Sequence, residues 1–286
     1  MIGIASDQLA ATINPLGAEL WSLTDAAGRA LMTDADPAFW TGRAPLLFPV
    51  VGRCRDDRIL VDGTPYPMPK HGFARRSPFT LVERASDHAT LRLEDSAGTR
   101  AAYPFAFRLD ARFALAGATL SIDIALTNPA ETALPASFGF HPAFAWPLPY
   151  GAPREAHQIA LAAPEGPLLK RITPEGYATD PVKPAPGQAF VLADALFTDD
   201  ALVWDPVTSQ ALRYGPAGGP WLDISWDAPR LGIWTKPGAR FVCVEPWHGI
   251  ADPEGWAGEY RDKPGVFTVP PGETWRTGMR VTLTTG

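Results

Sequence analysis

Residues 105–115 read Phe-Ala-Phe-Arg-Leu-Asp-Ala-Arg-Phe-Ala-Leu, and apolar side chains occupy every second position. In an extended strand this period of two places the apolar set on one face. A short turn at 116–118, Ala-Gly-Ala, follows, and the alternation resumes over residues 120–126. Two such runs joined by a glycine turn predict an antiparallel β-hairpin that packs one face on a core.

Similar short runs recur along the chain, most of them bounded by Pro, Gly, Asp or Asn, at 89–94, 224–226, 231–234 and 280–284. Long amphipathic helical patterns are missing, so the strand pattern predicts an all-β sandwich or barrel. The segment 147–186 is rich in Pro, Gly and Ala with weak periodicity. We expect it to form a long loop over the edge of a sheet.

The composition is that of a folded, slightly acidic protein. Of 286 residues 46% are hydrophobic, including ten Trp and fourteen Phe, which is enough apolar material for one large core. We expect a single domain over residues 1–286. The 25 basic and 31 acidic side chains leave a net charge of -6. This balance argues against nucleic acid or an anionic membrane as a partner.

The chain start and the cysteine content suggest a compartment. Residues 1–7 lack a basic segment followed by an apolar run, and no stretch is long enough to span a bilayer, so we expect a cytoplasmic protein. Cys54 and Cys243 are the only cysteines, and so low a count predicts two free thiols. Cys243 lies in the apolar run 241–244, which favours a small buried side chain over a nucleophile.

Several cofactor and catalytic motifs are missing from the sequence. No glycine-rich loop follows a strand to hold a nucleotide phosphate, and no Gly-x-Ser-x-Gly turn presents a serine nucleophile. Histidines do not occur at the local spacing of a metal site, since His71 and His141 are far apart and His248 stands alone. We therefore expect no cofactor and no metal.

Three polar segments stand out: 70–75 (Lys-His-Gly-Phe-Ala-Arg), 138–144 (Phe-Gly-Phe-His-Pro-Ala-Phe) and 244–249 (Val-Glu-Pro-Trp-His-Gly). Each sets ionisable side chains among aromatic residues, and glycine or proline lies beside them. This mixture is typical of a concave site that presents proton-handling groups to a ring-shaped ligand. Together they suggest acid/base chemistry on a sugar.

Each residue also has a plainer interpretation. His71 and Arg75 could donate hydrogen bonds to hydroxyl groups or belong to a solvated basic turn. His141 suits proton exchange or a hydrogen-bonded core position. Glu245 follows a buried run, so its carboxylate either pairs with another group, takes part in the chemistry, or simply emerges into water at the strand end. Trp247 could support a sugar ring or fill the core.

With the stretches 16–23 and 40–53, the three segments resemble the aldose 1-epimerase (galactose mutarotase) family nearly end to end, and within it an uncharacterised bacterial branch. The most specific matches are His-Gly-Phe-Ala-Arg at 71–75, Gly-Phe-His-Pro-Ala-Phe at 139–144 and Cys-Val-Glu-Pro-Trp at 243–247. Their order and spacing together make the resemblance strong.

The resemblance implies a large antiparallel β-sandwich with few short helices, a site in a groove across one sheet, and no cofactor. The family's pattern makes His141 the general acid on the ring oxygen and Glu245 the general base on the anomeric hydroxyl. His71 would bind and orient the sugar. An aspartate before a strand would hold hydroxyls, and this matches Asp200, with Asp199 as the alternative.

The substrate is open at this point. Glu245 is followed by Pro-Trp-His where the family more usually has Thr-Gln, and Arg43, Arg53 and Arg75 exceed what a neutral hexose requires. Bidentate arginine contacts would suit a sugar phosphate or an acidic sugar. We expect a mutarotase acting on a hexose or hexose phosphate, with a substrate-binding set of His71, Arg75, Asp200, Arg43 and Trp247.

Two other functions fit the same segments. A non-catalytic carbohydrate-binding or regulatory protein would keep the groove without the reaction. A glycosidase or lyase would need a second carboxylate beside Glu245, for which Asp200 and Asp252 are uncertain candidates. The oligomeric state cannot be predicted from these residues.

Overall fold

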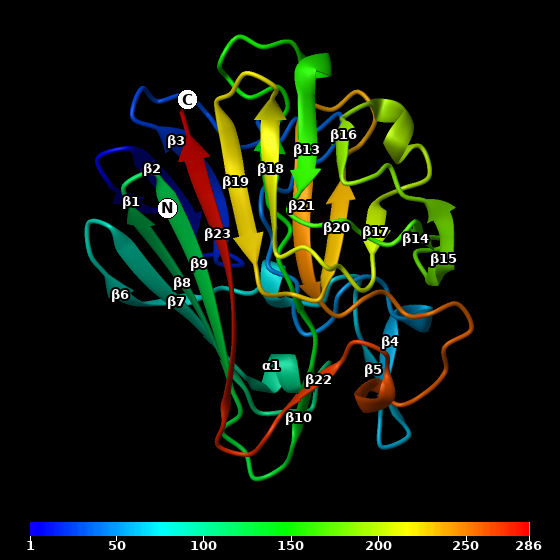
Figure 1. Cartoon of the computed structure of the whole chain (residues 1–286). Helices are drawn as coiled ribbons and strands as arrows, with labels where there is room; N and C mark the ends of the chain where they lie inside the picture. The colour runs from blue at the N-terminus through cyan, green and yellow to red at the C-terminus, as the bar shows by residue number, and fades with distance from the viewer. Residues whose placement is uncertain (286) are drawn as a thin grey trace.

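The computed structural model describes residues 1–285, and two large antiparallel sheets dominate it (Figure 1). The first has nine strands. In spatial order they are β16 (Ala189–Val191), β13 (His157–Leu161), β18 (Ala211–Pro216), β19 (Trp221–Trp226), β23 (Thr274–Thr284), β9 (Thr119–Thr127), β8 (Arg108–Ala116), β7 (His88–Glu94) and β6 (Thr80–Arg84).

The second sheet has seven strands and carries the third polar segment. In spatial order they are β11 (Phe138–Gly139), β21 (Phe241–His248), β20 (Arg230–Trp234), β17 (Leu202–Trp204), β14 (Leu168–Ile172) and β15 (Ala178–Pro184), and β12 (Ala143–Ala145) also pairs with β21.

Small sheets and short helices complete the described part of the chain. The small sheets are β1 (Ile2–Ala5), β2 (Leu9–Asn14) and β3 (Glu19–Asp25); β4 (Arg58–Val61) and β5 (Thr64–Pro67); and β10 (Leu134–Ala136) and β22 (Phe267–Val269). The helices are α1 (Ala97–Arg100) and the 3-10 turns η1 (Arg55–Asp57), η2 (Ala74–Arg76), η3 (Arg154–Ala156), η4 (Asp194–Phe197) and η5 (Tyr260–Asp262). The predicted all-β class with few short helices is confirmed. Among residues 1–285, no helix has the length and apolar character needed to cross a membrane.

The hairpin predicted from residues 105–126 is present as β8 and β9. Phe113 lies opposite Ile122, and the turn falls at residues 117–118. The side chains of Leu109, Phe113 and Ile122 are buried, whereas their neighbours along each strand are partly exposed. The period of two in the sequence is therefore the burial pattern of the strand.

The prediction of a long loop over 147–186 was wrong, because this segment contains β13, β14 and β15. β15 lies at the edge of the seven-stranded sheet, pairs only with β14 within the sheet, and contains Pro181 and Pro184. Proline has no N–H to donate, and an edge strand tolerates it because one side of that strand needs no partner. The prolines that suggested a loop thus mark an edge strand.

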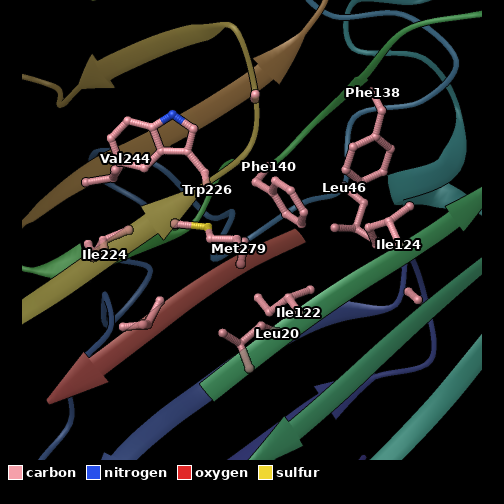
Figure 2. Close-up of a cluster of buried hydrophobic side chains, with 14 of the residues drawn as sticks. Leu20, Leu46, Ile122, Ile124, Phe138, Phe140, Ile224, Trp226, Val244 and Met279 are labelled. Atoms are coloured by element: carbon pink, nitrogen blue, oxygen red, sulfur yellow. The ribbon is translucent and has the colours of Figure 1, made fainter. Parts of the chain in front are cut away.

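The core lies between the two large sheets (Figure 2). Ile122 of β9, Ile224 of β19 and Met279 of β23 belong to the same buried cluster as Val244 of β21. Phe140, which belongs to the second polar segment, lies in the same group. Burial of this apolar surface supplies the main favourable free energy of folding.

β21 alternates between this core and the opposite face of the seven-stranded sheet. Val242 and Val244 join the main core, whereas Cys243 and Trp247 belong to separate small clusters on the other side. Glu245 is two residues from both Cys243 and Trp247, so the alternation of side chains along the strand places its carboxylate on that second face. The sandwich therefore fixes where the third polar segment presents its side chains.

Replacing Ile122 by Ala should lower the free energy of unfolding by about 2–5 kcal/mol, because it leaves a cavity between the sheets. The matched control is Ser121→Ala, on the opposite face of the same strand and only partly buried, which should change stability by less than about 0.5 kcal/mol. Urea unfolding followed by circular dichroism measures both. Equal effects at the two positions would contradict the assigned strand facing.

Candidate active site

A cavity of about 200 Å³ opens on the face of β20 and β21 that turns away from the main core. Side chains from all three polar segments line it, including His71, His141 and Glu245. Arg75, Asp200 and Trp247, predicted from the sequence, also line it. Its volume suits one small polar molecule better than a drug-sized ligand.

His141 and Glu245 form a buried pair at this cavity. His141 Nε2 lies 3.1 Å from Glu245 Oε2, and the residues are 9% and 2% exposed. Glu245 lies on β21, and His141 lies between β11 and β12, which both pair with β21. The strand pairing thus brings the second and third polar segments together. The alternative in which Glu245 emerges into water at a strand end is wrong.

Burial drives both members of the pair toward their uncharged forms. Loss of water raises the pKa of Glu245 well above its usual value, and the nearby charge of Asp200 adds to this effect while Lys70 opposes it. Burial lowers the pKa of His141, and the charges of Lys70 and Arg75 act in the same direction. Together the two groups favour holding a single proton, which leaves the pair without net charge.

His71 is held by a reciprocal contact with Gly52. The His71 N–H donates to the Gly52 carbonyl at 2.8 Å, and the Gly52 N–H donates to His71 Nδ1 at 3.1 Å. Because Nδ1 accepts, the neutral ring carries its proton on Nε2. His71 has φ +66°, and the next residue is Gly72, where a Cβ would lie 2.1 Å from the Phe48 carbonyl oxygen. Glycine is therefore required there for the turn.

Aromatic rings surround the His141 imidazole. The Trp40 ring lies over it with a centroid distance of 4.9 Å and a tilt of 30°. His71 and Trp234 approach edge-on at 5.8 and 5.9 Å. These rings restrict the orientations of the imidazole and remove water from it, in keeping with the lowered pKa of His141.

Trp247 packs mainly against backbone. Its ring lies so close to Gly139 and Gly232 that a Cβ at either glycine would come within 2.6 Å of it. Gly232 is also the residue opposite Glu245 in the β20–β21 register. Trp247 is only 6% exposed, so most of the ring fills the protein and a small part reaches the cavity. Most of the ring therefore belongs to the packed interior, and its support of a sugar ring stays a prediction.

The cavity contains cations as well as carboxylates. Lys70 and Arg75 line it, and neither side chain forms an ion pair with a carboxylate of residues 1–285. Arg75 is partly buried, and this burial lowers its pKa. Asp200 lines the cavity just before β17, whereas Asp199 is not among the lining residues.

Arg43, predicted to bind substrate, lies outside the cavity. Its guanidinium donates to the carbonyls of Trp21, Thr33 and Asp34 and stacks on the Trp21 ring at 4.7 Å. These contacts hold the 40–53 stretch to the N-terminal strands. We therefore leave Arg43 out of the proposed site.

The two remaining charged candidates also lie elsewhere. Arg53 pairs with Asp57 at 3.0 Å on the surface. Asp252 forms a buried ion pair with Lys263 at 2.7 Å and accepts from the Arg55 N–H, so it does not face Glu245 across the cavity.

Among the cavity residues with charged or aromatic side chains, Lys70, Trp40 and Trp234 were not predicted from the sequence. Lys70 precedes His71, and Trp40 begins the 40–53 stretch. Because both residues lie in segments that the sequence already singles out, they could have been predicted as site residues. Trp234 had no such signal, because only the β20–β21 register places it near Cys243.

The site also contains one group of potential metal ligands. Donor atoms of His141, Cys243 and Glu245 lie within 4.8 Å of one another, and among residues 1–285 this is the one such group of three. Local sequence spacing could not reveal it, because His141 comes from a different segment.

A larger hollow of about 690 Å³ lies on the outer face of the nine-stranded sheet. Its charges are largely paired with one another, as in Arg280 with Asp123 at 2.7 Å and Arg108 with Asp110 at 3.7 Å. Its lining residues contain no buried acid/base pair like that of the smaller cavity. Size alone therefore does not identify the functional site.

Residues 1–282 match the family model described as aldose 1-epimerase. The chain belongs to the aldose 1-epimerase family. The match spans nearly the whole sequence, so the predicted family membership is confirmed. All three polar segments lie within the matched region.

Three relatives of this family member come from Lactococcus and Lactobacillus species. The chromosomal protein LacX of Lactococcus lactis is 28% identical over 99% of both chains. A galactose mutarotase-like protein from Lactobacillus casei is 27% identical with a TM-score of 0.92, over 99% of this chain and 100% of that chain. A galactose mutarotase related enzyme from Lactobacillus acidophilus is 27% identical with a TM-score of 0.91, over 99% and 97%.

At about pH 6 we expect the rings of His71 and His141 to be uncharged, because burial lowers both pKa values below 6.5 and a base is neutral above its pKa. His71 Nδ1 should show the chemical shift of an unprotonated nitrogen. Long-range proton–nitrogen correlation spectra measure this, with His71→Asn and His141→Asn to assign signals. A titration midpoint near about 6.5 for either ring would contradict the assigned burial.

Proposed function

We propose that this protein is a mutarotase that interconverts the α and β anomers of a hexose or hexose phosphate. The observation that carries the proposal is the buried pair of His141 Nε2 and Glu245 Oε2, 3.1 Å apart at a small polar cavity. Membership of the aldose 1-epimerase family supports the same assignment. Anomer exchange requires one base and one acid, and this pair supplies both.

In the proposed ring opening, Glu245 removes the proton from the anomeric hydroxyl. The electrons of that O–H bond form the C1 carbonyl, the bond from C1 to the ring oxygen breaks, and His141 gives a proton to the ring oxygen. Rotation about the C1–C2 bond then presents the other face of the aldehyde. The same transfers in reverse close the ring as the other anomer.

One proton on the pair is sufficient for this cycle. In the free site burial holds this proton on Glu245 beside a neutral imidazole. Ring opening therefore begins when the proton passes across the 3.1 Å contact to His141 and leaves Glu245 as a carboxylate, and it ends with a proton on Glu245 and a neutral imidazole. The pair therefore carries no net charge in either state, which a buried site favours. Each direction of the reaction starts from the form that the other direction produces.

The remaining cavity residues bind and orient the sugar in this proposal. His71 presents Nε2–H as a donor, because Gly52 occupies Nδ1. The exposed carboxylate of Asp200 accepts hydrogen bonds from hydroxyl groups. Trp40 and Trp234 give the flat apolar surface on which a sugar ring packs.

Lys70 and Arg75 favour a phosphorylated hexose over a neutral one. Both line the cavity without a carboxylate partner among residues 1–285, and a guanidinium offers paired donors to phosphate oxygens. Removing water from Arg75 without supplying an anion is unfavourable, which a bound phosphate would offset.

Glu245→Gln and His141→Asn should each slow anomer exchange by about 10²–10⁴-fold, because each removes one proton-transfer group while keeping a similar shape. Magnetisation exchange between the two anomeric H1 signals of glucose, galactose and their 6-phosphates measures the rate directly. The double variant should be little slower than the single ones, because both act on one shared proton.

Sugar binding to the same variants separates catalysis from binding. Calorimetric titration of Glu245→Gln should still show binding of each sugar that wild type exchanges. If wild type binds a sugar but never exchanges its anomers faster than buffer, the protein is a non-catalytic carbohydrate-binding protein for that sugar, and the mutarotase proposal fails.

Arg75→Ala should lower kcat/KM for a hexose 6-phosphate by about 10- to 150-fold, the loss of about 1.5–3 kcal/mol of charged hydrogen bonding. The neutral hexose should be affected much less. The matched control is Arg76→Ala, since Arg76 is the next residue, carries the same charge and is exposed outside the cavity. An equal loss on neutral and phosphorylated sugars would refute a phosphate contact at Arg75.

A further inference from the structure

We infer that the cavity floor is a binding site for a thiophilic divalent cation such as Zn²⁺, with His141, Cys243 and Glu245 as ligands. The donor atoms of these three residues already lie within 4.8 Å of one another. All three residues are buried. The mechanism proposed above gives Cys243 no part, so this grouping is an additional property of the site.

The strand pattern explains why the three ligands meet. Cys243 and Glu245 are two residues apart on β21, so their side chains leave the same face of the strand. Ala143 lies opposite Cys243 in the β12–β21 register, and His141 precedes it by two residues. The imidazole is therefore held beside both β21 side chains by backbone pairing.

The donor set fits a tetrahedral metal. Thiolate, imidazole and carboxylate are the protein ligands of Zn²⁺, and tetrahedral bond lengths place neighbouring donors about 3.3–3.6 Å apart. The distance from His141 Nε2 to Glu245 Oε2 is 3.1 Å, and the remaining donor separations, which are within 4.8 Å, would have to close by at most about 1.5 Å. Because His141 and Glu245 line the cavity, a water molecule has access to the fourth position.

Few existing contacts oppose this coordination. Among residues 1–285, the Cys243 thiol makes no hydrogen bond, and the imidazole and carboxylate contact each other. Binding releases two protons to the buffer, the thiol proton and the single proton held by the pair of His141 and Glu245, and the resulting thiolate and carboxylate neutralise the divalent charge.

The charge of the cavity restricts which cation binds. Lys70 and Arg75 line the same cavity and repel any cation. Coordination by sulfur must outweigh this repulsion, which favours ions with high affinity for thiolate and disfavours Mg²⁺ and Ca²⁺. The site therefore binds a thiophilic ion. The effect of this ion on activity rests on the proposed function: a metal bound to His141 and Glu245 blocks both proton-transfer groups.

Cobalt is the probe for this site, because a Co²⁺–thiolate bond gives a charge-transfer absorption that Co²⁺ bound to oxygen and nitrogen lacks. Titration of the full-length protein with Co²⁺ should produce this absorption with one ion per chain, and Zn²⁺ should displace it. Mg²⁺ at the same concentration should not. Absence of the band at millimolar Co²⁺ would overturn the inference.

The two buried cysteines provide matched variants. Cys54→Ser leaves Cys243 as the sole thiol of the chain and should keep the band, whereas Cys243→Ser should lose it. Because the Cys54→Ser spectrum assigns the ligand without altering the site, the test survives even if Cys243→Ser fails to fold. Loss of the band in Cys54→Ser, in folded protein, would place the metal elsewhere and refute the site.

Anomer exchange tests the consequence separately. For any sugar that wild type exchanges, saturating Zn²⁺ should slow exchange at least about tenfold, because the acid and the base are both coordinated. Undiminished exchange in the metal-saturated protein would refute the block. If no sugar exchanges at all, the proposed function fails, while the cobalt spectrum still decides the metal site.

Discussion

The burial of one carboxylate on a central strand is the constraint on which the rest of the site depends. Glu245 lies in β21, 2% exposed, and removing an ionised carboxylate from water without a partner is strongly unfavourable. Burial raises the pKa of Glu245 and so favours its neutral form, beside a His141 imidazole that lies 3.1 Å away and is itself kept neutral. The pairing of β11 and β12 with β21 holds that histidine in place. The strand pairing of the sheet therefore also positions the two groups for acid/base chemistry.

The surroundings of the pair are arranged to keep it dry and oriented. Trp40 covers the His141 ring, and Trp247 fills the space above Gly139 and Gly232, where any side chain would collide with it. The polar groups are placed at the rim, where Lys70, Arg75 and Asp200 face the cavity. A site built this way offers two proton-transfer groups below and charged binding groups above, which is what the proposed anomer exchange of a hexose phosphate requires.

Comparison of sequence and structure separates local from non-local information. The β8–β9 hairpin follows directly from a period of two, because each residue's face depends only on its neighbours. The same reasoning failed over 147–186, where prolines on the edge strand β15 imitate a loop. Arg43 shows that charge alone does not identify a binding residue. Its charge suggested contact with a substrate, yet its guanidinium already contacts three backbone carbonyls and the Trp21 ring.

The sequence by itself determined the all-β class, the aldose 1-epimerase family, and the residues most suited to acid/base chemistry, because these depend on periodicity, composition and ordered motifs. Only the tertiary structure decided that His141 and Glu245 touch, that Lys70, Trp40 and Trp234 join them, and that the Cys243 sulfur lies within 4.8 Å of donor atoms of both. The contact of His141 with Glu245 joins segments about a hundred residues apart in the chain, and strand register, which no local pattern specifies, sets it.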